Sequence, residues 1–193
     1  SDLDVLRNTL LFSNLITVAH NLNRNNRNIK VFEYGKGYKS DGVYSEKEYL
    51  SICLTGTKTE FWGSNNENVG PYYLRKIVES IFTKLNLDVS LSDLESNEFE
   101  GFAYKVAKDI VSSGGKVRSE YLNIFDINQD VYFAEIDLDK LISILGEDSL
   151  FYEELNKFPS VRRDLSLLIS EDTQFKTISD ICLKVDRKTL KDV

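Results

Sequence analysis

The chain has 193 residues, of which 41% are hydrophobic and 28% are charged, and this composition is typical of a soluble globular protein. The net charge of −7 argues against a large nucleic-acid-binding surface, because phosphate binding depends on lysine and arginine. No apolar run approaches the roughly 18 residues of a membrane-spanning helix, so we expect no membrane partner. Since the chain starts on Ser1 with neither an initiator methionine nor a signal-peptide pattern, we expect a piece of a larger protein that is not secreted.

The charge is uneven along the chain. Basic and acidic residues are equal in number in residues 151–193, so the whole negative charge lies in residues 1–150. Only the C-terminal part is therefore neutral enough to approach RNA easily. Cys53 and Cys182 lie far apart in apolar patterns and are expected to be reduced thiols, and no cysteine–histidine spacing indicates zinc. The single histidine, His20, is expected at the surface.

The N-terminal part predicts one helix and two strands. Apolar residues recur at helical spacing from Leu11 to Leu22, and the pattern ends in the asparagine-rich residues 23–28. Residues 29–34 are expected to form a strand that Gly35 and Gly37 end. Residues 49–55 alternate between two faces, as a second strand does.

The middle of the chain predicts a second helix and a hairpin. Pro71 opens the clearest helical pattern, which runs to Leu85, because proline is favoured at the first helical position. Trp62 is expected at the edge of the core. Residues 103–111 and 116–122 are expected to pair around 112–115, whose Ser-Ser-Gly-Gly sequence is a hairpin signal. Residues 131–137 predict a strand and residues 138–145 a short helix.

We expect a domain boundary after residue 150, with a linker at 146–149. In residues 151–193, Leu165, Leu167 and Ile169 alternate as in a strand. A helix follows, and Asp172 or Thr173 is expected to cap it. One strand and one helix cannot bury a core, so this part is expected to be a fragment of a domain.

The order of these elements predicts the fold class. Strands joined by hairpins rather than by regular crossovers imply a mainly antiparallel sheet with helices packed on it, an α+β fold. No glycine-rich phosphate loop follows a predicted strand, which disfavours a Rossmann or P-loop domain.

Four motifs occur in the order and spacing of one known family. They are Leu-Arg-Asn-Thr-Leu-Leu at 6–11 with Asn-Leu-Asn-Arg at 21–24, Phe-Glu-Tyr-Gly at 32–35, Phe-Asp-Ile at 125–127 before the strand 131–136, and Phe-Pro-Ser-Val-Arg-Arg-Asp at 158–164. Together they resemble the beta subunit of bacterial phenylalanyl-tRNA synthetase over nearly the whole chain. Their common order makes the resemblance specific.

The resemblance implies that residues 1–150 form a class II aminoacyl-tRNA synthetase-like domain that has lost its active site. This domain would be the structural partner of a catalytic alpha subunit in a cytoplasmic heterotetramer of two alpha and two beta chains. Residues 151–193 would be a linker and the start of a ferredoxin-like anticodon-binding domain that contacts tRNA. ATP and magnesium would serve the whole enzyme, with no cofactor held by this fragment, and any editing site would lie upstream.

By the same resemblance, Arg7, Arg24 and Glu33 are the candidate subunit-interface residues. We expect Glu33 to pair with Arg7 or Arg24, because a buried charge on a strand needs a partner, and the alternative is that all three charges are solvated. The polar residues 14, 17, 21 and 24 of the first helix are expected to be exposed, with a subunit contact as the alternative.

Arg162 and Arg163 are the candidate tRNA-facing residues, since they precede a predicted strand and could reach phosphate groups. An ion pair with Asp164 or with the preceding segment is the alternative for them.

Arg118 and Glu120 resemble the Phe-Arg-x-Glu tetrad with which class II enzymes hold ATP, and a solvated strand face with one ion pair is the alternative. The Gly-x-Gly-x-Gly-x-x-x-Arg segment that would supply a second arginine is absent, so we expect no catalytic residue. The acidic pairs Glu98/Glu100 and Glu153/Glu154 offer no metal geometry.

Two other functions stay open at this point. A catalytically active class II ligase-like enzyme would bind ATP by itself through Arg118. A regulatory module derived from a synthetase would bind a small metabolite in its degenerate pocket, and the metabolite would stabilise it.

Overall fold

The computed structural model describes residues 5–40, 42–58, 67–145, 159–170, 172–186 and 189–190. The chain separates into two units, Ser1–Ser149 and Leu150–Val193, and each is described by itself. The expected boundary after residue 150, the expected position of Trp62 at the edge of the core and the acidic pair Glu153/Glu154 lie outside the described residues.

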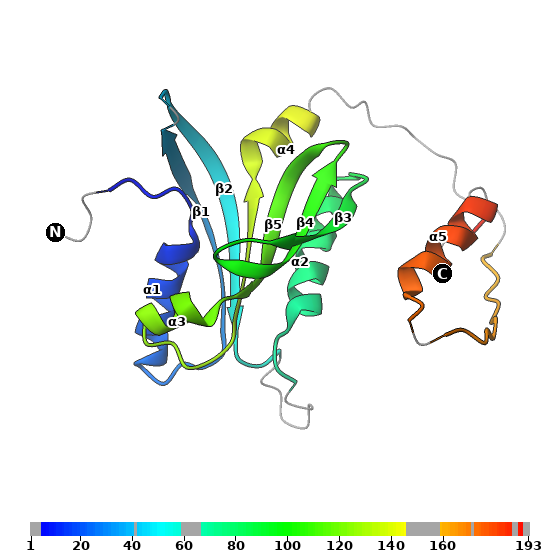
Figure 1. The fold of residues 1–193 in the computed structure, drawn as a ribbon, viewed down its shortest axis with the longest axis horizontal. Helices are drawn as coiled ribbons and strands as arrows, with labels where there is room; N and C mark the ends of the chain where they lie inside the picture. Colours follow the sequence, from blue (N-terminus) through cyan, green and yellow to red (C-terminus); the bar gives the residue numbers. More distant parts are fainter. Residues whose placement is uncertain are drawn as a thin grey trace. The chain divides into compact units, whose positions relative to one another are not determined.

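The first unit is built on a six-stranded sheet in which every neighbouring pair is antiparallel (Figure 1). The strands are β1 Ile29–Ser40, β2 Tyr44–Thr55, β3 Ser90–Glu95, β4 Phe99–Val106, β5 Asp109–Val117 and β6 Val131–Asp137. Their order across the sheet is β1-β2-β6-β5-β4-β3, so β6 joins the β1–β2 hairpin to the β3–β4–β5 meander. The expected antiparallel α+β fold is confirmed.

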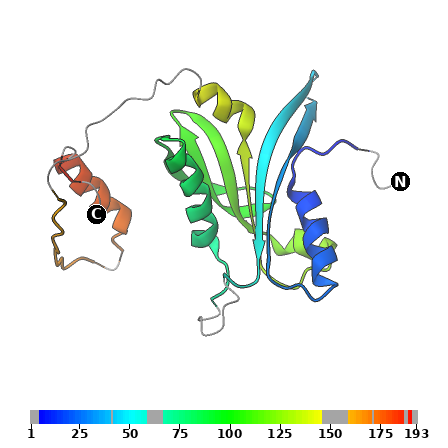
Figure 2. The same ribbon diagram turned by 180° about the vertical axis from the view of Figure 1, so that it is seen from behind.

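Helices cover both faces of this sheet (Figures 1 and 2). α1 Leu11–Leu22 and α3 Ser119–Ile124 lie on one face, and α2 Pro71–Lys84 and α4 Leu138–Leu145 lie on the other. The expected helices at 11–22, 71–85 and 138–145 are thereby confirmed, as is the strand at 131–137.

Each face has its own apolar core, because alternate residues of a strand point to opposite sides of a sheet. On one face Leu15 and Val18 of α1 pack against Cys53 of β2. On the other, Val78 of α2 packs against Ile52 of the same strand. Fully burying a side chain of this size stabilises the fold by about 1.5–3 kcal/mol.

Two glycines that were expected to end β1 lie inside it. β1 continues to Ser40, and β2 starts at Tyr44 rather than at residue 49. A Cβ atom on Gly37 would lie 2.9 Å from the Asn8 carbonyl oxygen and 2.8 Å from the Tyr49 ring. Glycine therefore marks a close approach of another segment here and not the end of the strand.

The hairpin expected around residues 112–115 is wrong. β4 turns into β5 at Ala107, which adopts a φ of 53°, and residues 112–115 lie within β5. A Cβ atom on Gly115 would lie 2.1 Å from the Glu100 carbonyl oxygen, so this glycine too serves a close approach within the sheet. Residues 119–124 form α3 instead of a strand, and β3 was not expected.

In the second unit, α5 Phe175–Val185 confirms the expected helix, whereas residues 159–170 contain no strand. Leu165 and Leu167 are exposed, because no described residue pairs with this segment and covers its apolar side chains. The expected cap is also wrong, since Gln174 is the N-cap of α5 and makes no side-chain capping hydrogen bond. None of the helices that the structure describes is long and apolar enough to cross a membrane.

Candidate functional site

A polar network lies where the N-terminal end of α1 crosses β1, β2 and β6. Glu33, Ser51 and Glu135 stand opposite one another in the strand register and so form one row across the three strands. This row faces α1, while the neighbouring Ile52 and Ile136 face α2. We call the row and the side chains that cover it the α1 network, which consists of Arg7, Thr9, Ser13, Asn14, Glu33, Ser51 and Glu135.

Glu33 is the centre of the network on β1. Its Oε1 accepts a hydrogen bond from Arg7 Nη1 at 2.7 Å, which is also an ion pair. Its Oε2 accepts hydrogen bonds from Ser13 Oγ at 2.8 Å and from Asn14 Nδ2 at 3.2 Å. The pairing expected for Glu33 is therefore present, and the partner is Arg7.

Asn14 joins α1 to β2. Its side chain is 2% exposed, and its Nδ2 donates to the Leu10 carbonyl at 2.8 Å and to Ser51 Oγ at 2.9 Å. The expectation of an exposed polar stripe is therefore wrong for Asn14, because helical spacing places it on the same side of α1 as Val18. Thr17 does lie at the surface.

Glu135 of β6 caps α1. Its Oε1 accepts the backbone N–H of Leu10 at 2.8 Å and the Thr9 hydroxyl at 3.2 Å. Leu10 is the N-cap residue, and its own N–H is the group that a glutamate of the first turn accepts in a capping box, so Glu135 takes this role from another strand. Burial raises the pKa of Glu135, and the hydrogen bonds from Leu10 and Thr9 oppose this rise.

Arg7 also forms hydrogen bonds with the outer edge of β1. The Tyr38 N–H donates to the Arg7 carbonyl at 2.8 Å, and Arg7 Nε donates to the Lys36 carbonyl at 3.0 Å. A Cβ atom on Gly35 would lie 2.4 Å from Arg7 Nη2, so glycine leaves the space that the guanidinium fills. The segment before α1 is thus held to both the face and the edge of β1.

The other predicted interface residue lies apart from this network. Arg24 follows the C-terminal end of α1, and its Nη1 donates to the His20 carbonyl at 3.1 Å. A cation is favoured there because the last carbonyls of a helix carry partial negative charge. His20 itself is exposed, as expected.

The predicted tRNA-facing residues are exposed. Arg162 Nε lies 3.9 Å from Asp164 Oδ1, and both side chains are 94% exposed, so this contact is weak. Arg163 is exposed beside it.

Arg118 is engaged within the first unit. Its Nε donates to the Ser96 carbonyl at 3.0 Å, and its Nη1 pairs with Glu100 Oε1 at 2.8 Å. It is the N-cap residue of α3 and not part of a hairpin strand. A hollow of about 370 Å³ beside it is lined by Ser96, Asn97, Arg118, Glu120 and Tyr121. The ion pair weighed for Arg118 is therefore present, with Glu100 as the partner.

Within the described ranges, no group of three or more histidine, cysteine, aspartate or glutamate side chains could hold a metal ion. Cys53 and Cys182 are free thiols, as expected. Burial in the core raises the pKa of Cys53 to about 12.

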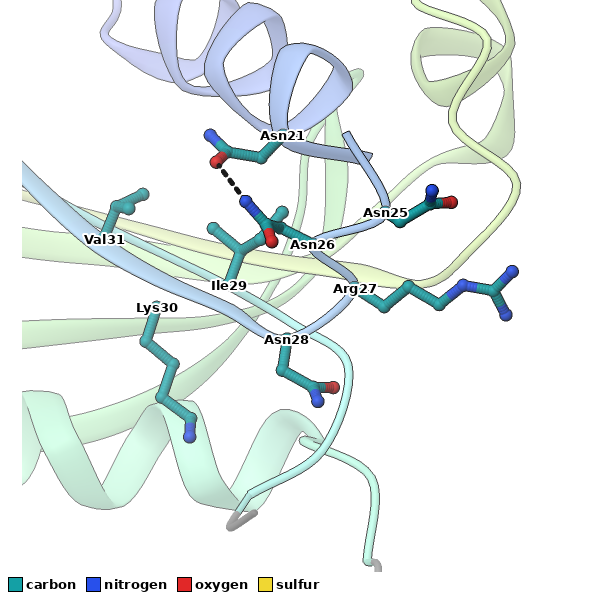
Figure 3. Close-up of a pocket in the computed structure, with 8 residues that line it drawn as sticks. All are labelled: Asn21, Asn25, Asn26, Arg27, Asn28, Ile29, Lys30 and Val31. Carbon is teal, nitrogen blue, oxygen red and sulfur yellow. Dashed lines mark hydrogen bonds between the residues drawn. The ribbon is translucent and has the colours of Figure 1, made fainter. Parts of the chain in front are cut away.

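A hollow of about 600 Å³ lies between the C-terminal end of α1 and the start of β1 (Figure 3). Asn26 Nδ2 donates to Asn21 Oδ1 at 3.5 Å, and the side chains of Arg27 and Lys30 point in different directions at its rim (Figure 3). Its lining consists of Asn21, Asn25, Asn26, Arg27, Asn28, Ile29, Lys30 and Val31.

Sequence reasoning missed Thr9, Ser13, Ser51 and Glu135. For Glu135 there was a signal, since an acidic residue inside the apolar strand 131–136 needs a partner when it is buried. For Thr9, Ser13 and Ser51 there was no such signal, because small hydroxyl side chains occur as readily at exposed positions.

The chain is similar to known proteins over its whole length. Residues 1–138 match the family described as the phenylalanyl tRNA synthetase beta chain CLM domain. A phenylalanine–tRNA ligase beta subunit of Bacteroides fragilis is 34% identical over 211 residues, which cover all of this chain and 26% of that protein. The corresponding protein of Chlorobaculum tepidum is 32% identical and covers 96% of this chain and 25% of its own length. The chain thus spans about a quarter of these relatives.

The fold is also shared with a solved structure. A pyrrolysyl tRNA synthetase of Desulfitobacterium hafniense superimposes with a TM-score of 0.56 at 18% identity, over 72% of this chain and 49% of that one. At this identity the likeness concerns the fold alone. It places the sheet of the first unit among class II tRNA synthetase folds.

Proposed function

The chain belongs to the family of the phenylalanyl tRNA synthetase beta chain CLM domain, and on this premise we propose that it is the non-catalytic scaffold part of a phenylalanine–tRNA ligase beta subunit. In this proposal it holds the catalytic alpha subunit during the ATP-dependent attachment of phenylalanine to tRNA. The complete enzyme is a cytoplasmic heterotetramer of two alpha and two beta chains, and its ATP and magnesium are bound by alpha.

The arginine and glutamate side chains described above are already bonded to partners within the chain, and this supports a scaffold role. An ATP site needs arginine side chains that are free to bind phosphate. Here Arg7 is bound to Glu33, and Arg118 is bound to Glu100 and to the Ser96 carbonyl. The carboxylate of Glu135 is used to cap α1. The observation that carries the proposal is this internal use of the polar groups in a chain with the family's sequence.

We propose further that the α1–β1 unit meets the alpha subunit. Arg7 and Glu33 fix the N-terminal end of α1 to β1, and Arg24 closes its other end. These charges then act by holding one rigid surface in place, with the contact to alpha made by the residues around them. Loss of the Arg7–Glu33 pair should weaken alpha binding and stability together.

The second unit would be the start of a ferredoxin-like domain that contacts tRNA. The exposed apolar residues Leu165, Leu167, Phe175 and Ile181 would be covered by the rest of that domain in the longer beta subunit. Arg162 and Arg163, which are exposed at its entry, would then reach tRNA phosphate. Reversing both charges should weaken tRNA binding by the complete enzyme mostly at low salt.

A titration of the chain with purified alpha subunit, ATP and phenylalanine tests the scaffold role. Binding to alpha without affinity for ATP is the expected result. Millimolar or tighter ATP binding in the absence of alpha would favour an active ligase-like enzyme that uses Arg118. Thermal stabilisation by phenylalanine or another small metabolite alone would favour a regulatory module.

A further inference from the structure

The segment before α1 covers part of the outer edge of β1. In the sheet that the structure describes, β1 is an edge strand with β2 as its neighbour. The Tyr38 N–H donates to the Arg7 carbonyl at 2.8 Å, and Arg7 Nε donates to the Lys36 carbonyl at 3.0 Å. These two groups of β1 are the ones that a further strand would use for pairing at this place. We call residues 5–8, which form no helix or strand, the edge strap.

The edge strap is held through the side chain of Arg7. Besides the Lys36 carbonyl, the guanidinium binds Glu33 Oε1 at 2.7 Å and Ser13 Oγ at 3.1 Å. The other strap residues are exposed. Without the guanidinium, the strap keeps its backbone bond to Tyr38 but loses these side-chain bonds.

The contacts that fix the start of α1 begin directly after the strap. Leu10 is 0% exposed, and its N–H and the Thr9 hydroxyl both donate to Glu135 on β6. These contacts do not involve Arg7. The strap can therefore leave the edge of β1 while α1 stays in place on the sheet.

The outer edge of β1 is complementary to a second copy of itself. The β1–β2 register is regular, so the backbone groups of the even-numbered residues from 32 to 38 point away from β2. Two antiparallel β1 strands can pair around a two-fold axis at Gly35. Tyr34 then lies opposite Lys36 of the second copy, and Phe32 lies opposite Tyr38. Cation–aromatic and aromatic pairs across strands stabilise a sheet, and the symmetry makes each of them twice.

The aromatic side chains of this edge are accessible on the face away from the strap. Phe32 is 77% exposed and Tyr34 is 58% exposed. Both lie on the α2 face, beside Ile52 and Leu50 of β2, whereas Arg7 binds Glu33 on the α1 face. The strap thus blocks the backbone of the edge and leaves its aromatic rings exposed. An edge strand with large exposed apolar side chains associates readily unless something blocks it.

We propose that the edge strap keeps β1 closed to a second copy of this chain, and that the Arg7–Glu33 pair is its lock. When the strap leaves, two chains join through β1 and their sheets become continuous. The inference goes beyond the scaffold function and does not depend on it.

The test measures the mass of the full chain by sedimentation over a range of concentrations. Arg7→Ala removes the lock and should dimerise at least about tenfold more tightly than the wild type. Gly37→Ala should also favour the dimer, because its methyl group would meet the Asn8 carbonyl oxygen and lift the strap. Arg118→Ala is the matched control and should behave as the wild type. It removes another partly exposed arginine that has an ion pair and a bond to a backbone carbonyl, away from β1.

A proline variant identifies the surface of the dimer. The Tyr34 N–H points away from β2, so Tyr34→Pro removes a donor of the outer edge and keeps the pairing with β2. The double variant Arg7→Ala/Tyr34→Pro should return to the association of the wild type. A dimer that survives the proline would lie on another surface and would overturn the proposal.

Amide hydrogen exchange follows the strap itself, first in the wild type. The Tyr38 amide should be protected there, but less than the Glu33 amide, which faces β2, because the strap opens without the sheet. In dilute Arg7→Ala the Tyr38 amide should exchange faster, and it should become protected again at concentrations that form the dimer.

Three results would contradict the proposal. Equal protection of the Tyr38 and Glu33 amides in the wild type would mean that the strap does not open by itself. Unchanged exchange of the Tyr38 amide in Arg7→Ala would mean that the guanidinium is not the lock. If this amide is exposed in Arg7→Ala and in Gly37→Ala while neither variant associates more than the wild type, the strap does not keep a second copy away.

Discussion

The carboxylate of Glu135 on β6 accepts the backbone N–H of Leu10 at 2.8 Å and so caps α1 from 125 residues away in the sequence. Most helix caps are local, because the side chain of the N-cap residue itself reaches the free N–H groups. Here Thr9 Oγ1 is a local acceptor for the N–H of Leu11 at 3.2 Å, but the acceptor for the N–H of Leu10 comes from the sheet, so this part of the cap forms only when β6 is in place. Formation of α1 and assembly of the sheet are therefore coupled.

This cap gives a prediction about pH. Burial raises the folded-state pKa of Glu135 above its ordinary value of 4.5, so the folded chain holds this proton more tightly than the unfolded chain does. The resulting stability is fully present below a pH of about 4.5 and is lost as the pH rises through the raised pKa. Glu135→Gln keeps an acceptor for Leu10 without the charge. It should flatten this part of the dependence of the unfolding free energy on pH. Urea unfolding between pH 4 and 8 measures it.

Glu95, which is exposed on β3, provides the control for this measurement. Glu95→Gln should leave the pH profile of the unfolding free energy as it is in the wild type. If the Glu135→Gln profile also runs parallel to the wild type, the burial of Glu135 has no effect on its ionisation.

The ion pair between Arg7 and Glu33 should be measurable in a double-mutant cycle. Both side chains are about one-third exposed, so screening limits the coupling, and we expect about 0.5–1 kcal/mol between Arg7→Gln and Glu33→Gln. The pair Lys116–Asp130, whose side chains are 51% and 57% exposed, is the control and should couple by less than about 0.5 kcal/mol. A coupling for Arg7–Glu33 no larger than that of the control would mean that the pair does not fix the segment.

Gly37 should be hard to replace. In Gly37→Ala the new methyl group would meet the Asn8 carbonyl oxygen and the Tyr49 ring, so the segment before α1 has to move, at a cost of about 1–3 kcal/mol. Gly70→Ala is the matched control, since a Cβ atom there meets nothing within 4 Å, and it should cost less than about 1 kcal/mol. Equal unfolding free energies for the two variants would contradict the close approach at Gly37.

The two thiols should react very differently with a thiol reagent. The pKa of Cys53 is raised to about 12, so on the order of one molecule in ten thousand carries its thiolate at pH 8, and the side chain is buried as well. Cys182 is partly exposed on α5. We expect one thiol per chain to be labelled at pH 8 and two in denaturant. In the folded Cys182→Ser variant the remaining thiol, Cys53, should not be labelled. Fast labelling of that variant would show that the core around Cys53 opens.

Several elements could be predicted because their signal is local. The apolar spacing from Leu11 to Leu22 specifies a one-sided helix, and Pro71 specifies a helix start. The alternation in residues 49–55 correctly separated the two cores of the sheet. The pairing of Glu33 could also be expected from the local sequence, since a charge among apolar strand residues needs a partner.

What the sequence by itself determined, then, is the helices α1, α2, α4 and α5, the strands β1, β2 and β6 except for the exact ends of β1 and β2, and the family. Only the tertiary structure decided what the glycines and polar residues do. Gly37 and Gly115 look like turn residues in the sequence, but each serves a close approach to a segment far away in the chain. Asn14 is buried and Glu135 is partly buried, because residues from other elements satisfy their hydrogen bonds. Residues 165–169 have the alternation of a strand and no described partner to pair with, since a strand forms only where another strand takes up its hydrogen bonds.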